Sequence, residues 1–260
     1  MIDKERILRM AMHGPLCWIG YLFRPFSYRF LSFVIVNIIR ILSISRSPIE
    51  GLRLVLSIEK GIYGVTAEEA VRYGKGTHTK HRHMGYHDFF CNRLGEGESV
   101  LDIGCGTGEL SFDMAAKANA NVTGIELIEK NYRKAKTQFK HNALRFIHGD
   151  AMTELPNISF NTIVMSNVLE HIENRVDFIV DVQKNIQPER WLFRVPMYER
   201  DWRVPLMDEI GLDSRLDSTH YIEYTQEKFI REIQTAGLEI VHIEIRWCEI
   251  WCEARPQGNC

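Results

Sequence analysis

A glycine-rich turn at residues 102–108 carries the strongest chemical signal in the sequence. An apolar run ends in Asp102, and Gly104, Gly106 and Gly108 then alternate with small residues before a helical pattern begins. Glycines let the backbone approach a ligand without a Cβ in the way. The free N–H groups at the start of the following helix face that ligand. The pattern therefore predicts a ligand-binding turn between a strand and a helix.

A carboxylate follows the turn at a spacing that indicates nucleoside binding. Glu126 ends the apolar run 121–126, about twenty residues after the glycines, where α/β folds place a carboxylate that binds ribose hydroxyls. Cys105 lies inside the turn, and we interpret its small side chain as a packing residue and not as a nucleophile. The alternative for Glu126 is a solvated acid at a strand end.

The segments that must position these residues alternate regularly between strand and helix. Predicted strands cover 99–103, 121–126, 143–148, 160–166 and 191–195, with helical patterns between them. Such alternation is typical of a parallel sheet. Residues 238–245 and 246–254 then predict two consecutive strands, which can pair as an antiparallel hairpin.

The turn at 102–108 closely resembles motif I of the class I S-adenosylmethionine-dependent methyltransferases, and residues 80–254 resemble that family at each later position. The resemblance implies an α/β, Rossmann-like fold with a seven-stranded, mostly parallel sheet, helices on both faces and a C-terminal antiparallel hairpin. It also implies S-adenosyl-L-methionine as the cofactor. The tail resembles a bacterial subgroup of small-molecule methyltransferases found among surface-polysaccharide and lipid-linked glycan genes. The family's usual Pro-Gly-Gly turn is missing at 187–190.

The family's cofactor contacts transfer to matching positions of this chain. Asp150 matches the residue that accepts from the adenine amino group, and Met152 matches a ring contact. Residues 166–171, Ser-Asn-Val-Leu-Glu-His, resemble the segment after strand four. The resulting set of cofactor-binding residues is Asp102, Gly104, Cys105, Gly106, Gly108, Glu126, Leu127, Asp150, Ala151, Met152, Ser166 and Asn167.

Two histidines are the candidates for a general base. His171 is the first choice and His220 the second, because imidazole titrates near neutrality and could take a proton from an acceptor hydroxyl. The alternative is that each is a structural histidine with satisfied hydrogen bonds. Four histidines between 78 and 87 lack a completing set of Cys, Asp or Glu, so the sequence predicts no metal site.

Acceptor contacts are expected from two segments that the common fold does not require. Residues 196–224 interrupt the alternation with arginines and aromatics, and residues 74–83 are polar and basic. Loops at this edge of the sheet carry function more often than the scaffold does. The alternatives are an ordered lid held by Arg–Asp pairs and a solvated basic loop. The predicted substrate residues are His81, Arg82, Arg200, Trp202, Arg203 and Tyr221.

Residues 1–60 form a separate, basic and apolar region. Arg29 and Arg40 bracket an apolar run of about half the ~20 residues that a membrane span needs. No small-residue cleavage site follows an apolar core, so a signal peptide is not expected. A basic helix with a wide apolar face suits a membrane surface. The alternatives are a cap on the catalytic domain and a homodimer interface. The predicted division is 1–60 helical, 61–254 methyltransferase and 255–260 tail.

Bulk composition limits the partners. Lys and Arg number 32 against 34 Asp and Glu, so no overall positive field attracts nucleic acid. The six cysteines are scattered, which favours a reducing compartment. We therefore expect a cytoplasmic enzyme, peripheral on the inner face of the membrane. Its acceptor would be a hydroxyl of a small molecule, sugar or lipid-linked glycan. The competing hypothesis is a non-catalytic, membrane-associated scaffold that retains the cofactor fold.

Overall fold

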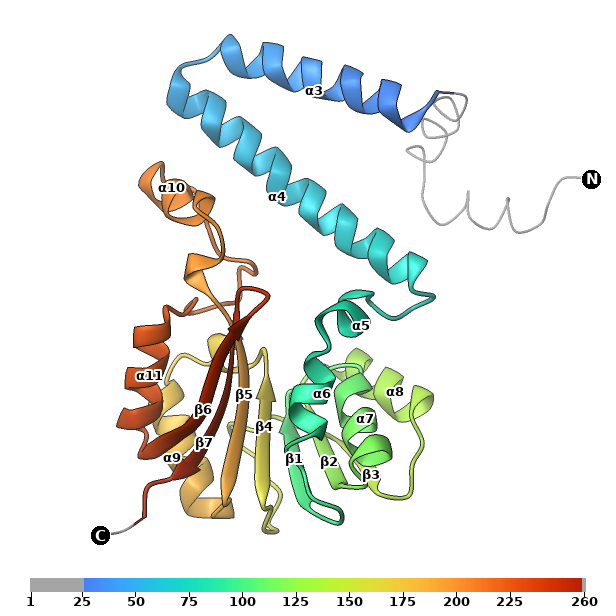
Figure 1. Cartoon of the computed structure of the whole chain (residues 1–260), viewed down its shortest axis with the longest axis vertical. Coiled ribbons are helices and arrows are strands. Elements are labelled where there is room, and N and C mark those ends of the chain that lie inside the picture. Colours follow the sequence, from blue (N-terminus) through green and yellow to red (C-terminus); the bar gives the residue numbers. More distant parts are fainter. Residues whose placement is uncertain (1–25, 259–260) are drawn as a thin grey trace, which may run out of the picture. The chain divides into compact units, whose positions relative to one another are not determined.

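The computed structural model describes residues 26–258, and the chain divides into two units, 1–66 and 67–260. The boundary lies within a helix, as does the predicted one after residue 60. Predictions for residues 1–25 and 259–260 lie outside the described part. The elements of the first unit are α3 (Tyr28–Ile44) and the start of α4 (Pro48–Tyr73) (Figure 1).

A capping residue begins α3, and a glycine lets it approach α4. The Ser27 hydroxyl caps α3 by accepting from the Phe30 N–H at 3.2 Å. A Cβ at Gly51 would lie 2.8 Å from the Ser43 hydroxyl, so the glycine permits close contact between α3 and α4 near their connection. Among the described residues, no helix combines the length and apolarity needed to cross a bilayer. The expected N-terminal helical region is confirmed over its described part.

The second unit is built on one seven-stranded sheet with the order β3-β2-β1-β4-β5-β7-β6 (Figure 1). The first five strands are parallel, and β7 runs antiparallel to both β5 and β6. This arrangement confirms the predicted Rossmann-like sheet. The strands are β1 (Ser99–Ile103), β2 (Asn121–Glu126), β3 (Leu144–His148), β4 (Thr162–Ser166), β5 (Arg190–Pro196), β6 (Leu238–Arg246) and β7 (Glu249–Pro256).

Helices cover both faces of this sheet (Figure 1). The strand β5 shows how the sequence achieves this: Trp191 and Phe193 face α9 and α11, and Leu192 between them faces α6 and α7. Strands buried on both sides are typical of parallel sheets. The helical segments are α5 (Lys80–Met84), α6 (Tyr86–Cys91), α7 (Glu109–Lys117), α8 (Glu129–Gln138), η1 (Leu169–His171), α9 (Arg175–Ile186), η2 (Tyr198–Arg200), α10 (Arg203–Glu209) and α11 (Gln226–Thr235).

The C-terminal hairpin differs from the prediction at its turn. Trp247 and Cys248 form the turn with φ of 54° and 59°, whereas the sequence analysis placed a strand start at residue 246. Two positive φ values are typical of a type I′ turn, which usually contains Asn-Gly or Asp-Gly. Neither dipeptide is present here, so the turn carried no recognisable signal. In addition, β7 continues to Pro256, two residues into the predicted tail.

The parallel pairing brings the functional loops to one edge. Ile103 pairs with both Ile125 and Met165, and Glu126 pairs with His148. The loops that follow β1, β2, β3 and β4 therefore leave the sheet side by side, at the carboxyl ends where open α/β sheets bind ligands.

Candidate active site

The glycine turn after β1 forms a cradle whose glycines have different roles. Gly106 has φ +58°, and a Cβ there would meet nothing within 4 Å. Gly108 has φ +89°, but a Cβ there would lie 2.7 Å from Phe146 Cζ and 2.9 Å from Ala135 Cβ. Gly108 is therefore required by packing against the fold. Gly106 instead borders open space that a ligand can enter.

The turn is fixed to the end of β2. The backbone N–H groups of Gly104 and Cys105 donate to the Ile125 carbonyl at 2.9 and 3.1 Å. Glu126, only 6% exposed, accepts from the Gly106 N–H at 2.8 Å and the Ile128 N–H at 2.9 Å. The oxygen that accepts from Ile128 also accepts from the Asn131 side-chain amide at 3.4 Å, whereas the oxygen that accepts from Gly106 retains a further lone pair. Glu126 is thus held in place by the backbone and can still accept from a ligand's hydroxyls.

Two other predicted residues at this turn pack against the fold, Asp102 fully buried and Cys105 partly buried. Asp102 is 1% exposed and accepts from the Ser111 hydroxyl of α7 at 2.5 Å. Its burial raises the pKa of the carboxyl to about 7. The Cys105 sulfur lies 2.7 Å from where a Cβ on Gly124 would stand, and burial raises the pKa of the thiol. Both observations agree with packing roles, and direct cofactor contact by either residue stays a prediction.

The loops after β2 and β3 present apolar side chains beside a carboxylate. Asp150 accepts from the Met152 N–H at 2.9 Å, which fixes the turn after β3. Leu127 and Met152 are 62% and 50% exposed. Ala151 is partly buried and packs against the main core. Leu127 and Met152 follow the adjacent strands β2 and β3 and offer an apolar surface suited to a flat ring. The Asp150 carboxylate lies in the same turn as Met152.

The segment after β4 contains a polar atom that lacks a partner. Asn167 adopts φ +56°, and its N–H donates to the Arg194 carbonyl at 2.7 Å. Its side-chain oxygen is buried and has no hydrogen-bond partner among the described residues. A buried acceptor without a donor is costly. Asn167 therefore fits a ligand that supplies an N–H or O–H group.

Arg194 on β5 organises this edge and was missed by the sequence analysis. It is 2% exposed, donates to both oxygens of Glu249 at 2.6 and 3.0 Å, and donates to the Ser166 hydroxyl at 3.0 Å. Its guanidinium lies 3.7 Å from the centre of the Tyr86 ring. The available signal was an arginine within the otherwise apolar run 191–195.

The two candidate bases lie together beside this edge. His171 ends η1 and is exposed, and His220 comes from the insertion after β5 and is 6% exposed. Their rings meet edge to face with centroids 4.6 Å apart. Glu170, which precedes His171, is fully buried and was not among the predicted site residues.

Ion pairs hold the insertion that was predicted at 196–224, as in the alternative of an ordered lid. Arg200 pairs with Glu223 and donates to the Ser214 carbonyl, and Arg203 pairs with Asp201. Within the insertion, the exposed members of the predicted substrate set are Trp202 and Tyr221, at 73% and 60%. Contact of any of these residues with an acceptor stays a prediction.

The segment α5 carries the remaining predicted substrate residues. His81 Nδ1 lies 3.1 Å from His87 Nε2, and His87 Nδ1 lies 2.7 Å from the Asp113 carboxylate. Burial and neighbouring positive groups lower the pKa of His81 to about 4, so it is neutral at physiological pH. The Arg82 guanidinium lies 5.9 Å from the centre of the Tyr73 ring. A role of either residue toward the acceptor is untested.

Known proteins share this sequence pattern. Residues 77–243 match the model of a methyltransferase domain family. An uncharacterized methyltransferase of Mycobacterium tuberculosis is 38% identical over 78 residues, covering 30% of this chain and 39% of that protein. A ubiquinone biosynthesis O-methyltransferase of Hydrogenovibrio crunogenus is 28% identical over 141 residues, covering 52% of this chain and 57% of that protein. The chain thus spans less than two thirds of either relative's length.

Solved structures share the fold. Magnesium protoporphyrin IX methyltransferase from Synechocystis, which holds S-adenosylhomocysteine, has a TM-score of 0.55 at 19% identity and covers 67% of this chain and 84% of its own. The methyltransferase in a Haloferax volcanii complex with the Trm112 activator has a TM-score of 0.58 at 13% identity and covers 71% and 93%. Together with the family match over most of the chain, the sheet and the glycine turn identify this protein as a member of the class I methyltransferases, which use S-adenosyl-L-methionine.

Proposed function

We propose that this chain transfers a methyl group from S-adenosyl-L-methionine to a hydroxyl oxygen of a small-molecule, sugar or lipid-linked acceptor. The observation that carries the proposal is the open position at Gly106 directly beside the Glu126 carboxylate. Relatives that act as ubiquinone biosynthesis O-methyltransferases support an oxygen acceptor.

The residues at the strand ends fit the cofactor along its length. Glu126 would bind the ribose hydroxyls, and Asp150 the adenine amino group with Leu127 and Met152 against the ring. The unpartnered oxygen of Asn167 would accept from the cofactor's amino group. When bound, the cofactor supplies a methyl group made electrophilic by its sulfonium. The protein's own task is to orient the acceptor and to remove its proton.

The paired imidazoles of His171 and His220 are the groups available for that proton. His171 is exposed and His220 lies against it, at the same edge as Asn167. Burial beside His220 lowers the pKa of His171, which keeps it neutral and able to accept a proton. The exposed Trp202 and Tyr221 on the neighbouring insertion would offer flat surfaces to a sugar or ring-bearing acceptor.

Calorimetry with S-adenosylhomocysteine tests this function against a non-catalytic scaffold. We expect the full chain to bind it, and Glu126→Gln to weaken binding about 10- to 100-fold, because hydrogen bonds to a charged group contribute about 1.5–3 kcal/mol. Glu129→Gln, an exposed carboxylate on α8 paired with Arg133, should bind as the wild type does. Absence of binding by the wild type would favour the scaffold. Mass spectrometry of glycans and lipids from a deletion strain would identify the acceptor.

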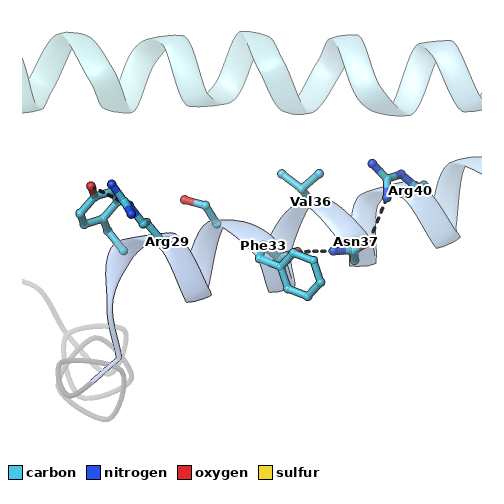
Figure 2. A pocket seen from close by; sticks show the side chains of 7 residues that line it. Arg29, Phe33, Val36, Asn37 and Arg40 are labelled. Atoms are coloured by element: carbon cyan, nitrogen blue, oxygen red, sulfur yellow. Dashed lines mark hydrogen bonds between the residues drawn. The ribbon is translucent and has the colours of Figure 1, made fainter.

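We also propose that α3 attaches the chain to an anionic membrane surface. No acidic residue occurs between 26 and 49, and α3 exposes apolar side chains around much of its circumference. Figure 2 shows Arg29, Asn37 and Arg40 along one side of α3, with Phe33 and Val36 between them. Both arginines bond to neutral groups, the Tyr28 hydroxyl and the Asn37 oxygen. Apolar insertion combined with positive charge favours anionic lipid.

Vesicle sedimentation tests this attachment. The full chain should sediment with vesicles containing phosphatidylserine and much less with neutral phosphatidylcholine vesicles. Ile41→Glu on α3 should reduce sedimentation, because it places a charge on the apolar surface. Val241→Glu, at a similarly exposed position of β6, is the matched control. Equal behaviour of the two variants would contradict the proposal, and a dimer disrupted only by Ile41→Glu would instead indicate an interface between copies.

A further inference from the structure

Glu170 carries a buried carboxyl group whose oxygens lack hydrogen-bond partners among the described residues. The residue is 0% exposed. Buried carboxylates are normally paired with a cation or hydrogen-bonded. A compensating ligand is therefore expected at its oxygens.

Two imidazoles converge on the same point. One ligand atom each from Glu170, His171 and His220 lies within 4.8 Å of the others. Glu170 and His171 belong to the η1 turn after β4, and His220 comes from the insertion after β5. The Tyr221 N–H donates to the Glu170 carbonyl at 2.8 Å, which fixes the two segments against each other. The fold thus brings together His171 and His220, which lie 49 residues apart in the sequence.

The surrounding hydrogen bonds determine which nitrogens are free. Thr219 donates its hydroxyl proton to Asp217 at 2.8 Å, so at 2.9 Å from His171 Nδ1 it must accept from that nitrogen. Glu223 pairs with Arg200 and accepts from His220 Nδ1 at 3.2 Å. In its neutral form each imidazole therefore carries its proton on Nδ1 and leaves the Nε2 lone pair free.

This arrangement is that of metal-binding histidines. A metal-ligating imidazole usually donates its other N–H to an oxygen that fixes its orientation, as Thr219 and Glu223 do here. Two histidines and one carboxylate form the three-ligand set of open zinc sites, which leave a further position for water or substrate. We propose that Glu170, His171 and His220 bind a divalent transition-metal ion, with zinc as the best match.

The ion would give the insertion and the paired imidazoles a common role. It would tie the segment around His220 to the end of β4, and its open position would take an acceptor oxygen. Metal coordination makes a hydroxyl more acidic, so an acceptor bound at the open position could lose its proton to solvent water while both imidazoles hold the ion. This role rests on the proposed function, whereas ion binding itself rests only on the cluster.

Equilibrium dialysis of the full-length, untagged and chelator-treated protein against Zn²⁺ tests the binding. We expect about one ion per chain, and a loss of affinity greater than about tenfold in Glu170→Gln and in His171→Gln, since even outer partners contribute 10- to 100-fold. Glu170→Gln keeps the buried volume, and His171 is exposed, so both variants should fold. His242→Gln, an exposed histidine on β6, is the matched control. Co²⁺ titration should give visible absorption bands that disappear in the same two variants.

Wild type that takes up no Zn²⁺, or that binds it no better than Glu170→Gln and His171→Gln, excludes an ion at this cluster. S-adenosylhomocysteine affinity measured in the same samples reports separately on the proposed function. Protein that binds S-adenosylhomocysteine but not Zn²⁺ would refute the metal site and leave methyl transfer standing.

Discussion

Gly106→Ala is expected to lower the affinity for S-adenosylhomocysteine by about 10- to 100-fold and to leave the fold intact. In the protein alone a Cβ at this position meets nothing within 4 Å, so the methyl group finds space. We propose that the cofactor approaches the turn through that space, and overpacking a close contact costs about 1–3 kcal/mol. The loss should therefore be seen in binding far more than in stability.

Gly97→Ala supplies a matched control for the backbone strain. Gly97 also has a positive φ, +74°, and open space around its Cβ position. It precedes β1, at the end of the strand opposite the glycine turn. Both variants pay about 1–2 kcal/mol for a left-handed alanine, and urea unfolding should show similar losses. Calorimetry should then show weaker binding of S-adenosylhomocysteine by Gly106→Ala than by Gly97→Ala. Equal affinity of the two variants would contradict cofactor binding at Gly106.

The sequence was sufficient for features that depend on neighbouring residues. The sheet followed from apolar runs alternating with helical patterns, and β1 and β2 were predicted with their observed bounds, Ser99–Ile103 and Asn121–Glu126. Glu126 followed from its distance to the glycines, because the end of one parallel strand lies beside the end of the next. Such inferences need only local periodicity and a known connection length.

Features that depend on distant partners could not be read in the same way. Arg194 looks like an isolated charge in an apolar strand until β7 brings Glu249, 55 residues later, to two of its three guanidinium nitrogens. Glu170 looks like an ordinary acid beside a histidine, and only its complete burial makes it chemically unusual. Burial and pairing across the sheet are set by tertiary packing, which a single sequence does not display.

His171→Ala is expected to reduce methyl transfer by about 10²- to 10⁴-fold, the range attributed to a positioned proton-transfer group. The residue is exposed and ends the short η1 turn, so its removal should cost little stability. Affinity for S-adenosylhomocysteine should stay unchanged, because His171 is not among the predicted cofactor contacts, which lie in the glycine turn, in the loops after β2 and β3, and at Ser166 and Asn167. Loss of transfer without loss of binding separates acceptor activation from cofactor binding.

Transfer of tritium-labelled methyl groups into an extract of a deletion strain provides the measurement before the acceptor is known. His242→Ala removes an exposed imidazole from β6 and should transfer at the wild-type rate. Full transfer by His171→Ala would remove this histidine from the reaction. If His171→Ala and His220→Gln lose transfer activity to the same extent, the two histidines act jointly. Their rings lie 4.6 Å apart, and residues with a shared role have non-additive effects on activity. In that case the double variant should lose no more than either single variant, which a purely structural role for His220 does not predict.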